Sequence, residues 1–92
     1  MSRPILRATD AAGEVYDDPS EDALYMFMED LASPGSFIRV ERLEDERKGE
    51  WAQVAMTEAR LYEFDSSGHV HYVSSLQTIH EFLTRWAFDL PE

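Results

Sequence analysis

Apolar residues between positions 18 and 33 recur at helical spacing, and this pattern predicts an amphipathic helix over residues 18–33. Asp18 is expected to cap its N-terminus, with Pro19 in the first helical position and Glu21 completing a capping box. The Ser-Pro-Gly segment at 33–35 ends the helix, because proline cannot continue it and glycine permits a turn. The predicted apolar face consists of Ala23, Leu24, Phe27, Met28 and Leu31.

A second helical pattern occupies residues 75–88, close to the C-terminal end of the sequence. Ser74 and Gln77 have the spacing of a capping box, so the helix is expected to begin just after Ser74. Leu90 and Pro91 end it. Its predicted apolar face consists of Leu76, Ile79, Leu83 and Trp86.

Between the two helices, residues 36–73 show the alternation of apolar and polar positions that is typical of antiparallel strands. The alternating segments are 36–43, 50–56, 60–64 and 69–73. The polar loop 44–49 is expected to join the first two as a hairpin. Residues 57–59 lack the Gly or Asn of a tight turn, so 51–64 forms either a hairpin or one long bulged strand. We favour the hairpin.

The N-terminal arm, residues 1–16, adds one further possibility. Its apolar start can form a short edge strand that pairs with Val15 and Tyr16 across a turn at 10–13. The order of elements then indicates a single α+β domain in residues 1–92. We expect two layers, with both helices packed on one face of a three- to four-stranded antiparallel meander.

Composition limits the class of protein. The chain has no cysteine, which excludes disulfides and thiolate metal sites and fits a reducing cytoplasm. No run of apolar residues is long enough to span a membrane, and the first residues lack the apolar core of a secretory signal. We therefore predict a cytoplasmic protein that does not insert into membranes.

Charge gives the strongest functional indication. The net charge is −11, which disfavours direct binding to nucleic acids or anionic lipids but suits a basic protein partner. Residues 8–38 contain eight acids and no Lys or Arg. Either solubility or recognition of a partner explains this acidic span. If the span serves recognition, the expected partner-binding residues are Asp17, Asp18, Glu21, Asp22, Tyr25, Met26, Glu29 and Asp30.

The histidines are the candidates for a metal site. His69 and His71 lie two apart in a predicted strand, so both point to one face and could supply two of the ligands of a zinc ion. If Val70 and Tyr72 face the helices, this pair faces the uncovered side, whereas His80 points toward the covered side. We therefore expect no metal or other cofactor, with His69 and His71 as the only weak candidates.

Enzymatic activity is not expected. The serines fall at caps and turns, outside any nucleophile motif, so no catalytic residue is assigned. Glu63, between two aromatic residues, is the one carboxyl group whose surroundings suit acid–base chemistry. A small metal-dependent enzyme that uses His69 and His71 remains an alternative. A third possible function is that of an oligomerisation or accessory subunit, because Trp51 and Gln53 lie on the predicted open face of the sheet.

The strands, the turn in "DSSGHVHY" and the final segment "SLQTIHEFLTRWAFDLP" together resemble a known class of protein. Over residues 15–90 the chain is similar to small actinobacterial immunity-type proteins of polymorphic toxin systems. This resemblance implies an inhibitor that covers the basic surface of a toxin, nuclease or nucleic-acid-binding protein. A phage inhibitor that mimics a phosphate backbone would act in the same way, and a homodimer is compatible with either.

Overall fold

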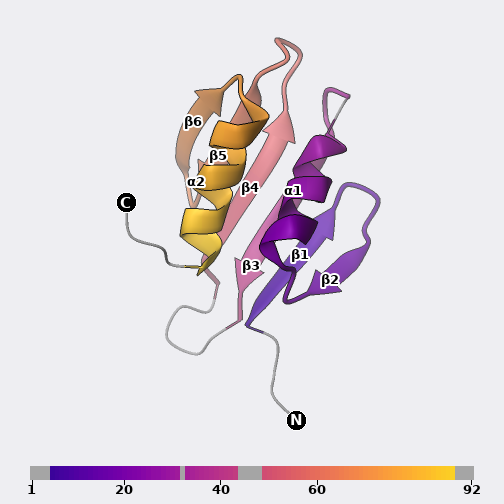
Figure 1. Ribbon diagram of the computed structural model, residues 1–92, viewed down its shortest axis with the longest axis vertical. Coiled ribbons are helices and arrows are strands. Elements are labelled where there is room, and N and C mark those ends of the chain that lie inside the picture. The colour runs from indigo at the N-terminus through magenta and orange to yellow at the C-terminus, as the bar shows by residue number, and fades with distance from the viewer. Residues whose placement is uncertain (1–4, 32, 44–48, 89–92) are drawn as a thin grey trace.

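Two helices cover one face of a six-stranded antiparallel sheet (Figure 1). The protein is described by a computed structural model, which covers residues 5–31, 33–43 and 49–88. The strand order across the sheet is β2-β1-β3-β4-β5-β6. In chain order the elements are β1 (Leu6–Asp10), β2 (Val15–Asp17), α1 (Glu21–Glu29), β3 (Phe37–Arg42), β4 (Trp51–Met56), β5 (Tyr62–Ser66), β6 (His69–Val73) and α2 (Leu76–Phe88).

The α+β class and the single helical layer are confirmed, whereas the predicted number of strands was too low. The N-terminal hairpin forms as expected, with Ala8 opposite Tyr16 and Thr9 opposite Val15. However, β1 is not an edge strand, because it also pairs along its whole length with β3. The edges of the sheet are β2 and β6. The pairing of β1 with β3 joins segments far apart in the chain, which local patterns do not reveal.

The first helix is shorter than predicted, and its cap is a different residue. Ser20 caps α1, since its hydroxyl accepts a hydrogen bond from the Ala23 amide at 3.1 Å. Asp18 has a φ of 49°, in the left-handed region, and stands outside the helix with Pro19. The capping box predicted for Asp18 and Glu21 was therefore wrong. Serine in an extended conformation immediately before the first helical turn is the more favourable cap.

The second helix matches its predicted bounds to within a residue at its start, but Ser75 rather than Ser74 supplies the cap. The Ser75 hydroxyl accepts a hydrogen bond from the Thr78 amide at 3.3 Å. Replacing Ser75 with alanine is expected to lower the free energy of unfolding by about 1 kcal/mol, because one amide of the first turn loses its acceptor. Ser74→Ala is the matched control. Equal losses in a urea titration of the two variants would contradict this assignment.

Residues 51–64 form a hairpin rather than one bulged strand, so the favoured alternative is confirmed. The loop between β4 and β5 closes through Thr57, whose amide donates to the Leu61 carbonyl at 3.0 Å. Arg60 supplies the positive φ, 65°, that a Gly or Asn was expected to provide. The polar hairpin loop predicted for 44–49 falls largely outside the described residues.

The core lies between the helical layer and the covered face of the sheet. The least exposed side chains come from both helices and from the central strands, as the alternation predicted. The largest of them are Leu24, Met28, Ile38, Val40, Val54, Ile79 and Leu83. Their packing fixes both helices on one side, and no described helix covers the opposite face of the sheet, which we call the open face.

Arg42 is the charged residue that is buried in the described part of the chain, with an exposed fraction of only 3%. It follows Ile38 and Val40 on the covered side of β3 and lies under the C-terminal end of α2. Its guanidinium donates to the carbonyls of Trp86 and Ala87 and stacks on the Trp86 ring, with 4.4 Å between Cζ and the ring centroid. An ion pair of 3.2 Å joins its Nε to Glu50.

Candidate partner-binding surface

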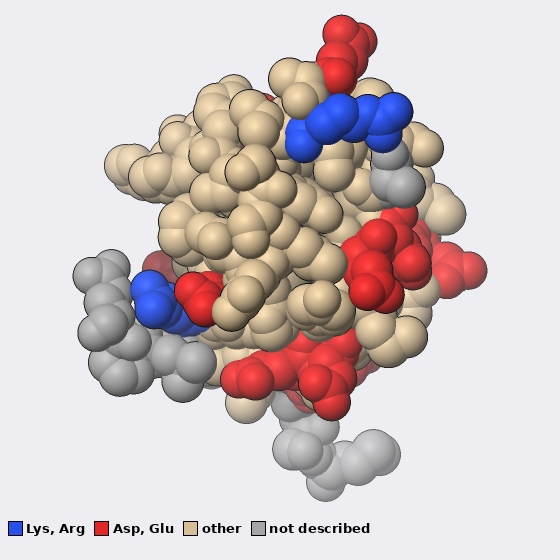
Figure 2. Space-filling view, turned by 45° about the horizontal axis from the view of Figure 1, so that its top comes forward, with Lys and Arg blue, Asp and Glu red and all other residues tan. Residues whose placement is uncertain are grey.

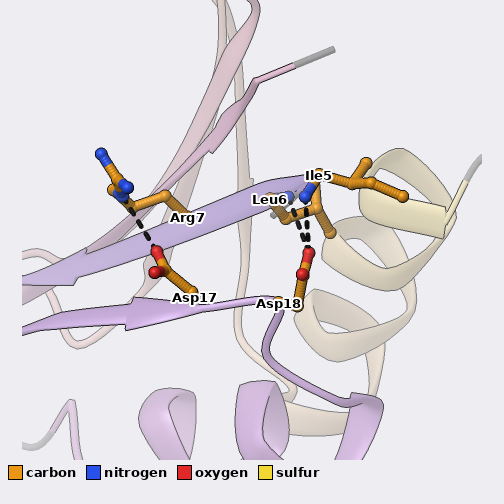
Figure 3. Close-up of polar contacts among 5 residues, drawn as sticks. All are labelled: Ile5, Leu6, Arg7, Asp17 and Asp18. Carbon is orange, nitrogen blue, oxygen red and sulfur yellow. Dashed lines mark hydrogen bonds and ion pairs between the residues drawn. The ribbon is translucent and has the colours of Figure 1, made fainter. Parts of the chain in front are cut away.

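The structure separates two of the eight predicted partner-binding residues from the others. The Asp17 carboxylate accepts a hydrogen bond from Arg7 Nε at 3.0 Å, and Asp18 Oδ1 accepts from the amides of Ile5 and Leu6 at 2.8 and 3.0 Å (Figure 3). Both carboxylates therefore hold the hairpin of β1 and β2 together. They belong to the architecture of the N-terminal edge rather than to a free acidic surface.

The remaining six residues lie together on α1 and are all exposed. We call them the α1 surface: Glu21, Asp22, Tyr25, Met26, Glu29 and Asp30. Among the residues that the structure describes, none of its four side-chain carboxylates forms an ion pair with a basic residue. Met26 in the middle of the helix is 62% exposed. The α1 surface thus combines unneutralised negative charge with an accessible apolar side chain.

Tyr25 is held between the two helices. Its ring meets the His80 imidazole edge to face, with 5.2 Å between the centroids. His80 in turn places Nε2 at 3.1 Å from the backbone carbonyl oxygen of Glu21. Tyr25 therefore packs against α2. At 38% exposure, its ring is accessible beside the carboxylates of α1.

The helix dipole makes one end of the α1 surface unusual. Glu21 and Asp22 lie in the first turn, where negative charge is favourable. Glu29 and Asp30 lie at the C-terminal end, where the dipole opposes negative charge, and the last turn has no basic residue. The negative potential is therefore concentrated at the C-terminal end of α1, at a cost to the stability of the helix.

A pocket of about 260 Å³ adjoins this end of α1. It lies between the helix and the hairpin of β1 and β2, and Asp10 and Asp30 are the carboxylates in its lining. Its aromatic lining includes Tyr16 and Phe27, whose ring centroids are 4.6 Å apart, and Phe37. None of Asp10, Tyr16, Phe27 and Phe37 was predicted to contribute to a partner-binding surface. The one signal in the sequence for any of these residues was the position of Asp10 within the acidic span 8–38.

Tyr16 at this pocket has a testable titration. Its hydroxyl donates to Glu14 at 2.6 Å, and this hydrogen bond is the main cause that raises its pKa from 10.0 to about 12. The pKa of the Tyr16 hydroxyl is higher in the folded protein than in the unfolded chain. The contact therefore stabilises the fold fully below pH 10, and this stability is lost as the pH rises toward 12. An NMR titration of the Tyr16 ring should show this pKa in the wild type and a lower value in Glu14→Gln. The same pKa in both proteins would contradict the assignment.

Acidic side chains are unevenly distributed over the surface. Figure 2 shows large groups of Asp and Glu at the right and lower sides of the face that it presents, whereas the Lys and Arg groups lie at its top and lower left, each close to a smaller acidic group. The centre and upper left of the same face carry no charge. A basic partner would therefore meet the negative potential from a defined side of the molecule.

The predicted orientation of the histidines was wrong. His71 lies opposite Phe64 of β5, and its ring is 6.0 Å from that of Phe82 on α2, so His69 and His71 share the covered side of the sheet. His80 is directed to α1 instead. In the described residues no three His, Cys, Asp or Glu side chains are placed to hold a metal ion together. The histidines face the covered side because the register of β5 and β6 places His71 opposite Phe64, which is buried in the core.

Glu63, the candidate for acid–base chemistry, lies on the open face of the sheet beside Tyr72. The Glu63 carboxylate raises the pKa of the Tyr72 hydroxyl, chiefly through a hydrogen bond. Trp51 and Gln53 also lie on this face, as expected. Arg39 stacks on the Trp51 ring, with 4.3 Å between Cζ and the ring centroid. These contacts link neighbouring strands.

No known protein family, curated protein or solved structure matches this chain. Within the described residues, neither helix has the length and apolar character needed to cross a membrane.

Proposed function

We propose that this protein is an acidic binding module that inhibits or neutralises a basic partner protein by covering its cationic surface. The observation that carries this proposal is the α1 surface. Its four carboxylates are exposed, two of them against the helix dipole, and the described residues provide no ion pair for them. Such an arrangement costs stability in the isolated protein, and a basic partner would offset that cost.

The side chains between the carboxylates support the same proposal. Tyr25 packs edge to face against His80, and Met26 beside it is largely exposed. Rigid aromatic residues and methionine are enriched at protein interfaces, where they bury apolar area at little entropic cost. The carboxylates would then select and orient the partner, while Tyr25 and Met26 anchor it.

The pocket beside Asp30 gives the proposed interface a second anchor point. Carboxylates and aromatic rings are the groups that receive a guanidinium or an ammonium, through ion pairing and cation–π contact. An arginine or lysine side chain from the partner would enter beside Asp30 and lie against Tyr16 and Phe27. Toxins with nuclease activity and other nucleic-acid-binding proteins display such side chains.

An NMR titration with a hexa-arginine peptide tests whether cations prefer this surface. The largest amide shifts are expected in residues 21–30 and around the pocket, and they should weaken as salt is raised above about 0.15 M. Glu58 and Glu81 are exposed carboxylates elsewhere and provide the internal comparison. Shifts of equal size around Glu58 and Glu81 would show that the peptide is attracted by the overall negative charge and does not prefer the α1 surface, which would contradict the proposal.

A further inference from the structure

Strand β6 forms one edge of the sheet and, in the described part of the chain, hydrogen bonds only with β5 (Figure 1). Edge strands usually carry a Lys, a Pro, a bulge or an inward charge that prevents pairing with another chain. The sequence of β6, HVHYV, has no Lys, Pro, Asp or Glu. Its register with β5 runs without interruption from Tyr62–Val73 to Ser66–His69, so no bulge turns the edge away.

The charge of the molecule makes this edge different from its surroundings. At a net charge of −11, most surfaces of two copies repel each other. The opposite edge strand, β2, has only three residues and includes Asp17. Next to β6, strand β5 includes Glu63 and Asp65. Strand β6 is therefore the edge along which two copies can approach without bringing carboxylates opposite each other.

The hairpin before β6 determines which backbone groups face outward. Ser67 and Gly68 both have positive φ, 51° and 100°, as in a two-residue type I′ turn. In such a hairpin the flanking residues, Ser66 and His69, form a hydrogen-bonded pair, and alternate pairs along the ladder repeat this arrangement. The N–H and C=O groups of Val70 and Tyr72 therefore point away from β5, toward solvent.

We propose that two copies of this chain pair through β6 as antiparallel strands, with a two-fold axis at His71. In this register Val70 lies opposite the partner subunit's Tyr72, and Tyr72 lies opposite the partner subunit's Val70. Each pair exchanges two backbone hydrogen bonds, so all four outward-facing groups of each strand are satisfied. The two sheets become one continuous sheet.

The side chains on the open face are self-complementary in this register. Val70 and Tyr72 are 43% and 58% exposed in the single chain, and both lie on the open face. A β-branched residue opposite an aromatic residue is a favourable cross-strand pair, and the two-fold axis forms it twice. Because the axis is perpendicular to the sheet, the helices of both copies lie on the same side. Both α1 surfaces therefore remain available, and this inference does not depend on the proposed function.

Sedimentation equilibrium tests the proposal with a matched pair of variants. Val70→Lys places a charge on β6, whereas Val15→Lys places the same charge on the other edge, at a valine that is also exposed. We expect a concentration-dependent dimer whose dissociation constant rises about tenfold or more in Val70→Lys and stays within about twofold in Val15→Lys. A wild-type monomer at about 1 mM would overturn the proposal. So would equal effects of the two variants.

Hydrogen exchange of the wild-type protein gives a test that does not depend on how the variants fold. The amides of Val70 and Tyr72 are expected to become more protected as the protein concentration rises, because pairing removes them from water. The Val15 amide on the other edge serves as the reference. If protection at Val70 and Tyr72 is independent of concentration while the protein dimerises, the dimer uses another surface and this inference is wrong.

Discussion

Replacing Arg42 with alanine is expected to lower the free energy of unfolding by about 3 kcal/mol, the largest loss that we predict for a single substitution. The guanidinium is buried and bonds to the last carbonyls of α2, so its removal leaves Trp86 and Ala87 without these donors. It also leaves a space under the Trp86 ring. Because the Glu50 side chain is 46% exposed, water compensates for part of the lost ion pair.

Two further variants separate hydrogen bonding from packing. Arg42→Met refills most of the space, so we expect about half the loss of Arg42→Ala. Arg39→Ala is the matched control, because Arg39 is in the same strand but lies on the open face with its side chain 39% exposed. We expect it to lose less than about 1 kcal/mol. Urea titrations measure all three, and similar losses for Arg42→Ala and Arg39→Ala would contradict the structural role of Arg42.

Reversing the charge of Asp22 and Glu29 to lysine is expected to slow association with a basic partner at least about tenfold. Both residues are exposed on the α1 surface, and the described residues provide no ion pair that the substitutions would break. The wild-type association rate should also fall steeply between about 50 mM and 0.5 M salt, because screening weakens the attraction between separated charges. The variant should show little salt dependence.

The matched control for this pair is Glu58→Lys with Glu81→Lys, which changes the net charge equally at exposed positions outside α1. We expect its association rate to stay within about threefold of the wild type at about 0.15 M salt. Stopped-flow or surface-based kinetics can measure all three proteins. If both double variants slow association to the same extent, the net charge and not the α1 surface attracts the partner.

Local patterns predicted the two helices, the alternating segments between them and the possible N-terminal hairpin, because these elements depend on neighbouring residues. They did not predict the order of strands. β1 lies between β2 and β3 because it also pairs with β3, where Leu6 lies opposite Arg42. These two residues are far apart in the chain, so no local turn signals their pairing. The caps were misplaced by one or two residues, since Asp18, Ser20, Ser74 and Ser75 all have side chains able to accept the same hydrogen bond.

The histidine error has a specific cause. Val70 and Tyr72 are the more apolar pair of β6, so the alternation placed them toward the helices. The two-residue turn at Ser67–Gly68 instead sets His71 opposite Phe64, and burial of Phe64 determines the face for both strands. An edge strand is half exposed on both sides, and its own pattern therefore has less influence than its register. Turn length was the signal in the sequence that would have corrected this.

The predicted partner-binding residues fall into two groups that the sequence alone did not separate. Composition identified the acidic span, but it could not distinguish carboxylates that serve the fold from carboxylates that remain free. Asp17 and Asp18 bond to the N-terminal strand, and Asp10 accepts hydrogen bonds from two amides of its own turn. The pocket beside Asp30 depends on the hairpin lying next to the end of α1. That proximity is a tertiary feature.

Capture from native extract on three baits tests the proposed function most directly. The baits are the wild type, the Asp22→Lys/Glu29→Lys variant and the Glu58→Lys/Glu81→Lys variant, each eluted in steps from about 50 mM to about 1 M salt. We predict one basic protein, retained by the wild type and the control variant, released at intermediate salt and absent from the α1 variant. The same proteins on all three baits, or no specific protein on any, would contradict the account.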